Sequence, residues 1–311
     1  MAEFAPLAHD IYCIDALYMK PRVASIYLLR QGDEVALVET GTCHSLANVL
    51  ATLEALSIDR SQVKYVIPTH VHLDHAGGAG VMMRHFEQAQ LLIHARGASH
   101  MIDPRKLVEG TIGVYGADKF ERLYGHIEPI ASERVIVVDD LAKFSLEDRE
   151  LTFIDTPGHA RHHFCIYDER SNGVFTGDTF GICYAPMKAL PRGLIPTTPP
   201  VQFDPGALRQ SITRIMKFEP QRLYLTHYGE LADPGAQFDS FNQWIDEYVD
   251  LSRQFEPDSP DYETDLEQAL LHRVLQTLCG GPDPALQRIL QNDVNLNAKG
   301  LAHWRRRNAD G

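Results

Sequence analysis

Short apolar stretches separated by turn residues dominate the first three quarters of the chain. The stretches are rich in β-branched and aromatic residues, which predicts strands, and the first three follow one another closely enough to be consecutive antiparallel strands. Between later strands, apolar residues recur at helical spacing, which predicts helices. Strands are predicted at residues 11–14, 25–30, 34–39, 63–67, 90–94, 134–138, 151–154, 164–167, 173–176 and 222–226, and helices at 45–56, 79–87 and 206–218.

The pattern changes near residue 233. From there on only helical periodicity is found, at residues 241–255, 264–278 and 285–292 and around 296–307. An earlier stretch, residues 95–130, reads as an irregular insertion with short helical pieces. We therefore predict an α/β domain over residues 1–235 and a helical C-terminal region over residues 236–311.

Composition narrows the class of protein. A chain of 311 residues with 44% hydrophobic residues can bury a large core, and its net charge of −13 argues against nucleic acid or an anionic membrane as the main partner. The N-terminus has no basic segment followed by an apolar one, and no apolar run is long enough to span a bilayer. Five cysteines at no regular spacing do not form a disulfide framework. We expect a soluble, cytoplasmic protein.

The segment His70-Val71-His72-Leu73-Asp74-His75 carries the chemistry. It follows the predicted strand at 63–67 directly, where a strand gives way to a loop. Neutral imidazole and carboxylate are ligands of Zn²⁺ and of other divalent metals. Three imidazoles and one carboxylate within six residues therefore indicate a metal site.

Three later residues of the same kinds also follow predicted strands. His159 lies in Pro157-Gly158-His159, Asp178 lies just past the strand at 173–176, and His227 follows the strand at 222–226. Loops converge at strand ends, and sites are built there. Each residue alone would more often be a structural hydrogen-bonding group, but together with the first segment they indicate one site.

In this order, the motifs H-x-H-x-D-H, P-G-H, G-D and a final strand-borne histidine resemble the metallo-β-lactamase superfamily. The resemblance covers roughly residues 10–230 and implies an αββα sandwich, here with a C-terminal helical extension. It also implies that His70, His72 and His159 hold one metal ion, that Asp74, His75 and His227 hold a second, and that Asp178 bridges them. A pair of metals can share a hydroxide and polarise a carbonyl or phosphoryl oxygen, and Asp74 could orient this nucleophile and accept its proton.

Departures from the family pattern refine this interpretation. The β-lactamases of the superfamily place Cys or Ser where this chain has Asp178, and the diiron flavoproteins typically carry Glu where it has His72. The family motif Asp-x-Gly reads Glu39-Thr40-Gly41 here. We expect Glu39 to support the metal ligands as the aspartate does.

The resemblance leaves the substrate open. Helical additions in glyoxalase II and in a quorum-sensing thioesterase of the superfamily cap the site, so residues 95–130 and the C-terminal helices could wall a pocket, stabilise the fold or form a homodimer contact. Tyr184 and Tyr228 could donate to an oxyanion or simply pack. His162 and His163 could orient a ligand, or one could face the core and one the solvent.

We therefore expect a dinuclear metal-dependent hydrolase that acts on a small ester, thioester or lactone. A phosphodiesterase at the same site and an iron-dependent oxygen-using enzyme, similar to the persulfide dioxygenases of this fold, are the alternatives. Two divalent ions are expected, with Zn²⁺ first and Fe or Mn as alternatives.

Overall fold

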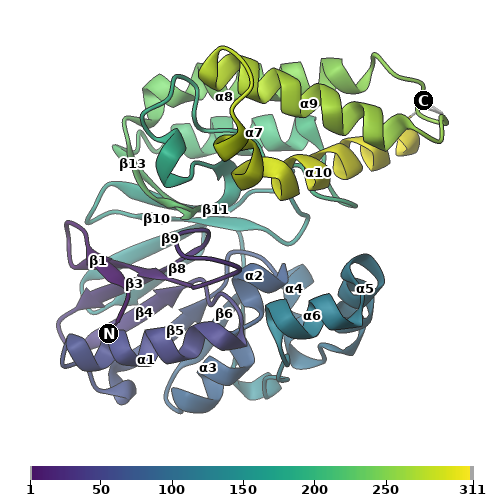
Figure 1. Cartoon of the computed structure of the whole chain (residues 1–311). Helices are drawn as coiled ribbons and strands as arrows, with labels where there is room; N and C mark the ends of the chain where they lie inside the picture. The colour runs from purple at the N-terminus through teal and green to yellow at the C-terminus, as the bar shows by residue number, and fades with distance from the viewer. Residues whose placement is uncertain (1, 309–311) are drawn as a thin grey trace. The chain divides into compact units, whose positions relative to one another are not determined.

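The strands form two β-sheets in the computed structural model, which describes residues 2–308 (Figure 1). Within these residues the first sheet has seven strands in the order β1-β2-β3-β4-β5-β6-β7, and the second has six in the order β13-β12-β11-β10-β9-β8. Strands β1 to β4 pair antiparallel and β4 to β7 pair parallel. The strands are β1 (Phe4–Pro6), β2 (Ile11–Asp15), β3 (Ser25–Gln31), β4 (Glu34–Val38), β5 (Val63–Ile67), β6 (Gln90–His94), β7 (Val135–Val138), β8 (Lys143–Leu146), β9 (Arg149–Asp155), β10 (Phe164–Asp168), β11 (Gly173–Ile182), β12 (Arg222–His227) and β13 (Gly229–Ala232).

Every predicted strand is present, and the structure adds three short ones, β1, β8 and β13. The parallel pairing of β4 with β5 positions the site. Val38 pairs with Ile67, and the Glu39 backbone N–H donates to the Ile67 carbonyl oxygen at 3.0 Å. Because parallel strands end at the same edge of a sheet, the residues after β4 and after β5 lie side by side.

Aromatic side chains fill the core between the two sheets. Tyr27 on β3 packs edge-on against Phe175 on β11, with ring centroids 5.2 Å apart, and Phe175 stacks on Tyr224 of β12 at 4.6 Å. The Tyr27 hydroxyl donates to the Leu225 carbonyl oxygen at 2.6 Å, so the one polar atom of this buried ring has a partner. The core thus follows from the alternation of apolar residues along both sheets.

The chain divides into two compact units, and the first comprises Met1–Asp155, His162–Gly177 and Pro220–Leu231. Its helices α1 and α3 pack on strands of the first sheet (Figure 1). The helices of this unit are α1 (Leu46–Ala55), α2 (Leu73–Ala76), α3 (Ala79–His85), α4 (Ala95–Ile102), α5 (Arg105–Tyr115) and α6 (Ala117–Tyr124), with 3₁₀ turns η1 (Cys43–Ser45), η2 (Arg60–Gln62) and η3 (Ser132–Arg134).

The prediction that residues 95–130 are irregular was wrong, although the helical pieces expected within this stretch are present. Three helices, α4 to α6, occupy most of this stretch. Pro104 precedes α5, and Gly116, with φ of 80°, separates α5 from α6. These breaks leave each helix too short to show a sustained apolar period, although Phe120 and Tyr124 of α6 are buried.

The second compact unit comprises Thr156–Arg161, Asp178–Glu219 and Ala232–Gly311. It contains η4 (Ala185–Met187), α7 (Pro205–Met216), α8 (Pro234–Ser252), α9 (Tyr262–Cys279) and α10 (Pro284–Arg307). Trp244 of α8 is fully buried and donates from its indole N–H to the Arg192 carbonyl oxygen. The helical C-terminal region is therefore present, and the boundary at residues 235 and 236 stays a prediction.

The two helical pieces predicted at 285–292 and near 296–307 are one helix, α10. The asparagine-rich stretch between them favours a break, because Asn side chains compete for nearby backbone groups. In the structure the side chains of Asn295 and Asn297 bond other segments instead of the helix backbone. Asn295 donates to Glu267 of α9 at 2.5 Å, and Asn297 bonds residues of a preceding loop.

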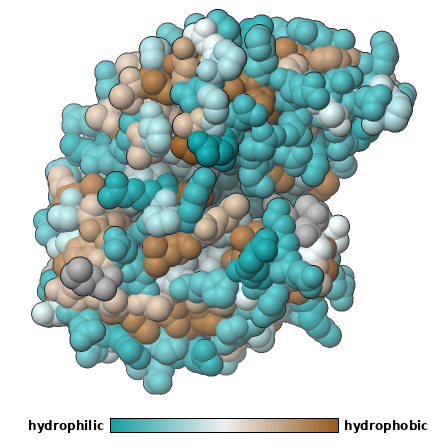
Figure 2. Space-filling view, viewed as in Figure 1, coloured by the Kyte–Doolittle hydropathy of each residue, from teal (hydrophilic) through white to brown (hydrophobic). Residues whose placement is uncertain are grey.

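The face drawn in Figure 2 is mostly hydrophilic, with apolar side chains in scattered patches. Among residues 2–308 no helix combines the length and the apolar character needed to cross a membrane. The five cysteines all lie within this range and none forms a disulfide there, as predicted.

Candidate metal centre

The early histidine segment begins immediately after β5. His70 and His72 lie in the bend between β5 and α2, with ring centroids 4.5 Å apart. The chain then turns into the short helix α2, which starts after His72 and carries Asp74 and His75. His70 and His75 are fully buried, whereas the Asp74 side chain is 23% exposed. Asp74 is therefore more accessible to solvent than His70 and His75.

Glu39 organises this segment from the end of β4. Its Oε1 accepts from the Thr69 hydroxyl at 2.6 Å, from Thr226 Oγ1 at 2.9 Å and from His75 Nδ1 at 3.0 Å. Its Oε2 accepts from the Thr69 backbone N–H at 3.1 Å. The supporting role expected for Glu39 is confirmed by these contacts, because a buried carboxylate with several donors fixes the groups around it.

The same contacts fix which ring nitrogen of each histidine carries the proton. His75 Nδ1 faces the Glu39 carboxylate, and His227 Nδ1 lies 2.7 Å from the Val23 carbonyl oxygen, which can only accept. The Thr69 hydroxyl donates to Glu39, so it accepts from His70 Nδ1 at 3.1 Å. A neutral imidazole has one N–H, so all three rings carry it on Nδ1 and leave Nε2 as a ligand atom.

Asp74, His75 and His227 bring such ligand atoms together. His75 Nε2 and His227 Nε2 lie 3.4 Å apart, and the Asp74 carboxylate oxygens lie 3.9 Å and 3.6 Å from them. Two imidazole nitrogens and one carboxylate are donors that divalent metals take, so the donor set fits a divalent metal.

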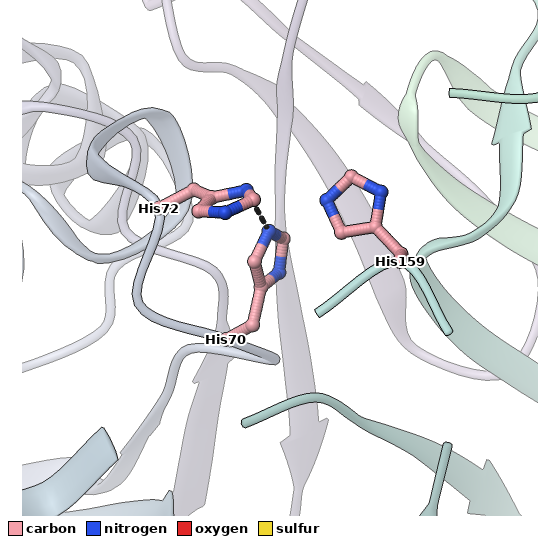
Figure 3. A group of neighbouring side chains, drawn as sticks. All are labelled: His70, His72 and His159. Atoms are coloured by element: carbon pink, nitrogen blue, oxygen red, sulfur yellow. Dashed lines mark hydrogen bonds between the residues drawn. The ribbon is translucent and has the colours of Figure 1, made fainter. Parts of the chain in front are cut away.

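His70 and His72 extend from the same loop with their ring nitrogens toward each other (Figure 3). His70 Nε2 lies 2.9 Å from His72 Nδ1. The Nε2 atom of His70 carries no proton in the arrangement set by Thr69, so its one lone pair accepts from His72 and would be given to a metal instead when one is bound.

His159 and Asp178 form a second pair. His159 Nε2 lies 3.3 Å from Asp178 Oδ2, and both side chains are buried. His159 Nδ1 faces Thr197, at 3.2 Å from its Oγ1 and 3.4 Å from its carbonyl oxygen. Asp178 lies within β11, which extends to Ile182, rather than past the end of the strand as predicted.

Within residues 2–308, the ligand atoms of Asp74, His75 and His227 all lie within 4.8 Å of one another. That His70, His72, His159 and Asp178 belong to the same centre stays a prediction.

The other residues singled out in the sequence have structural partners. His162 and His163 are both buried, so neither faces solvent, and the ring of His163 lies 4.8 Å from that of His70. Burial, and then the neighbouring His72, lowers the pKa of His162 to about 3. The Tyr184 hydroxyl donates to Asp293 of α10 at 3.1 Å, and burial raises the pKa of Tyr228.

The sequence interpretation missed the threonines that position the histidines. Thr69 directly precedes His70, and Thr226 directly precedes His227, each at the end of a strand. The repeated Thr-His dipeptide was the available signal. Thr197 has no comparable sequence signal, because it lies far from His159 along the chain.

Comparisons with known proteins identify the family of the chain. The sequence model of the metallo-beta-lactamase superfamily matches residues 19–227, more than half of the chain. A metallo-beta-lactamase fold-containing protein, ST1585 of Sulfurisphaera tokodaii, is 26% identical over 72% of this chain and 80% of its own length. An acyl-coenzyme A thioesterase of Gallus gallus, MBLAC2, is 25% identical over 56% of this chain and 64% of its own length.

Solved structures show the same fold. The crystal structure of ST1585 covers 95% of this chain and 99% of its own with a TM-score of 0.66 at 22% identity. A metallo-beta-lactamase family protein of Thermus thermophilus, TTHA1429, covers 96% of this chain and 94% of its own with a TM-score of 0.68 at 18% identity. The predicted α/β fold with two sheets and C-terminal helices is therefore confirmed.

Proposed function

The chain belongs to the metallo-β-lactamase superfamily of metal-dependent hydrolases, and we propose that it hydrolyses a thioester with two divalent metal ions. Each ion would be held by three side chains and Asp178 would be shared. The first set is His70, His72 and His159, and the second is Asp74, His75 and His227.

One observation carries this proposal. The Nε2 atoms of His75 and His227 face each other at 3.4 Å, beside the Asp74 carboxylate, while their Nδ1 protons are already committed to Glu39 and Val23. Imidazole nitrogens grouped with a carboxylate in a buried place are the donor set that divalent metals take. A site kept only for packing would not need this arrangement.

The chemistry follows from the ligand types. Bound divalent ions would lower the pKa of water toward neutrality and polarise the thioester carbonyl. Water adds to the carbonyl carbon, the C–S bond breaks, and the products are a carboxylic acid and a thiol. Asp74, whose side chain is partly exposed, is placed to hold the proton that the attacking water gives up.

The named activities of similar proteins favour a thioester over the other esters, and the charge of the chain argues against a nucleic acid. Among the similar proteins, those with a named activity include the Gallus gallus acyl-coenzyme A thioesterase and an atrochrysone carboxyl ACP thioesterase of Aspergillus fumigatus, which is 27% identical over 52% of this chain and 41% of its own length. The net charge of −13 disfavours a nucleic-acid substrate. Zn²⁺ is the first choice of metal, since imidazole and carboxylate suit it.

The test is turnover of a panel of acyl thioesters by protein loaded with Zn²⁺, with release of the thiol measured. We expect hydrolysis that His72→Ala abolishes and that His272→Ala, an exposed histidine on α9, leaves unchanged. Turnover that persists in His72→Ala would contradict the proposal.

The same preparation separates the alternatives. Turnover of bis(p-nitrophenyl) phosphate without turnover of thioesters would replace the proposal by a phosphodiesterase. Oxygen uptake by protein loaded with iron, again without thioester turnover, would replace it by an oxygen-using enzyme.

A further inference from the structure

Asn297 of α10 forms hydrogen bonds with both chain neighbours of Thr197, which are Pro196 and Thr198. Its Oδ1 accepts from the Thr198 backbone N–H at 2.6 Å, and its Nδ2 donates to the Pro196 carbonyl oxygen at 3.1 Å. Its own carbonyl oxygen accepts from the Thr198 hydroxyl at 3.0 Å. The side chain is only 2% exposed, so these bonds replace water on both of its polar atoms.

These bonds hold a loop that has few backbone donors of its own. The proline loop, residues 195–200, contains Pro196, Pro199 and Pro200. Proline has no N–H, so the loop cannot form a regular hydrogen-bond ladder and depends on outside partners. Asn297 binds the residue before Thr197 and the residue after it, which fixes the backbone of Thr197 from both sides.

Helix α10 also touches the loop closely. Gly300 lies one turn after Asn297 on the same face of the helix, and the Thr198 carbonyl group leaves no room there for a Cβ. Glycine at this position therefore allows the helix backbone to approach the loop backbone.

The other end of the loop is tied to the strand that carries Asp178. Ile195 and Ile182 exchange backbone hydrogen bonds of 3.0 Å and 2.9 Å at the end of β11. Asp178 lies four residues earlier on that strand, with its Oδ2 3.3 Å from His159 Nε2. The loop is thus paired with the strand that carries Asp178, and its Thr197 contacts the ring of His159.

Thr197 contacts the ring nitrogen of His159 that does not face Asp178. Its hydroxyl and carbonyl oxygens both face His159 Nδ1, so the loop engages this nitrogen and Nε2 is the one turned toward Asp178. A hydrogen-bond partner of this kind fixes both the tautomer and the orientation of a metal-bound imidazole.

We infer that Asn297 is a positioning residue of the metal centre: through Thr197 it sets the orientation of the His159 ring, so the C-terminal helix takes part in metal binding. This rests on the proposed function only in taking His159 as a metal ligand. Loss of such a partner typically weakens metal binding about 10- to 100-fold.

The experiment compares metal affinity, measured by competition with a chromophoric chelator, and the visible spectrum of the Co²⁺-loaded protein. We expect Asn297→Ala to weaken one of the two ions about 10- to 100-fold and to change the Co²⁺ spectrum. The matched control is Asn295→Ala, the same substitution two residues earlier on the same helix, where the side chain bonds Glu267 of α9 instead of the loop. The control should bind both ions as the unaltered protein does.

A second pair of variants decides the matter if Asn297→Ala does not fold. Thr197→Val removes the hydroxyl next to His159, whereas Thr197→Ser keeps it, and Thr197 is only half-buried. We expect weaker binding and an altered Co²⁺ spectrum in Thr197→Val, and normal values in Thr197→Ser.

Two results would overturn the inference: normal affinity and spectrum in Asn297→Ala and Thr197→Val, or equal losses in Asn297→Ala and Asn295→Ala. Both readouts need no substrate. Protein that binds two ions but hydrolyses no thioester would therefore refute the proposed function and leave the role of Asn297 standing.

Discussion

Each buried histidine among the candidate ligands is held in its orientation by the atom that its Nδ1 faces. For His227 this atom is the Val23 carbonyl oxygen, and for His75 it is a Glu39 carboxylate oxygen. These acceptors work without the metal, so the ligand atoms are oriented before a cation arrives. Pre-orientation of this kind lowers the cost of assembling the site.

Replacement of Glu39 by glutamine tests this role. An amide offers one acceptor oxygen where the carboxylate accepts four hydrogen bonds, so a donor from Thr69, Thr226 or His75 loses its partner. We expect Glu39→Gln to lower the free energy of unfolding of the metal-free protein by about 1–3 kcal/mol, measured by urea denaturation.

The matched control for that prediction is Glu34→Gln on β4. Glu34 pairs with Lys64 at 2.6 Å, but both side chains are about one third exposed, so its loss should cost less than about 1 kcal/mol. Equal losses in the two variants would contradict the role of Glu39.

The candidate ligands could be predicted from the sequence. The atoms that accept hydrogen bonds from the histidine ligands could not. Histidine and aspartate at strand ends are visible in the chain, as His70 and Asp178 show. The Val23 contact is made by a backbone carbonyl, which every residue possesses, and so no sequence pattern marks it. Thr197 is brought to His159 only by the proline loop, whose path depends on α10.

Helices and strands whose apolar pattern is uninterrupted were predicted well. β5 and β6 have the predicted bounds, because each is a short apolar run with clear ends. β11 runs six residues beyond the prediction of 173–176, since all ten of its residues are buried and its end contains two glycines that break the apolar pattern. At Gly181 the Ile195 carbonyl group leaves no room for a side chain.

An ion pair between β9 and β10 is a prediction at the element scale. Arg149 and Asp168 are fully buried and joined by hydrogen bonds of 3.0 Å and 2.6 Å, and Arg149 also donates to the His9 carbonyl oxygen. Removing one partner leaves a buried charge unpaired, so we expect Asp168→Ala to destabilise the protein by about 3–5 kcal/mol, read from chemical denaturation.

A neighbouring surface pair gives the comparison. Arg170 pairs with Asp10 at 3.0 Å, and both side chains are more than 40% exposed, so Asp10→Ala should cost less than about 1 kcal/mol. A loss of under about 1 kcal/mol in Asp168→Ala would refute the prediction for the buried pair.

For the whole molecule, burial predicts the order in which thiols react. Cys279 is exposed and Cys43 is half-buried, whereas Cys13, Cys165 and Cys183 are buried. Burial raises the pKa of Cys183 to about 11, so between pH 7 and pH 9 it stays a thiol, which is not nucleophilic. We expect native protein to be alkylated first at Cys279 and then at Cys43, and all five cysteines to react in urea.

Mass spectrometry after timed alkylation measures that order, and Cys279→Ser should remove the fast phase. Rapid modification of Cys183 in native protein at pH 8 would contradict it, because neither access nor a thiolate is expected there.

Metal binding should contribute to the stability of the folded chain as a whole. The proposed ligands come from segments as distant as His70 and His227, and the unfolded chain cannot hold them together. An ion that binds only the folded state stabilises it by about 2.7 kcal/mol when present at 100 times its dissociation constant. We therefore expect chelation to lower the Tm and Zn²⁺ to restore it. His227→Ala should reduce the difference between the metal-free and the metal-loaded Tm, and His272→Ala on α9 should retain it. If the Tm stays constant while elemental analysis shows that the metals have left, the ligands do not bridge distant segments, and the two-metal site fails with that result.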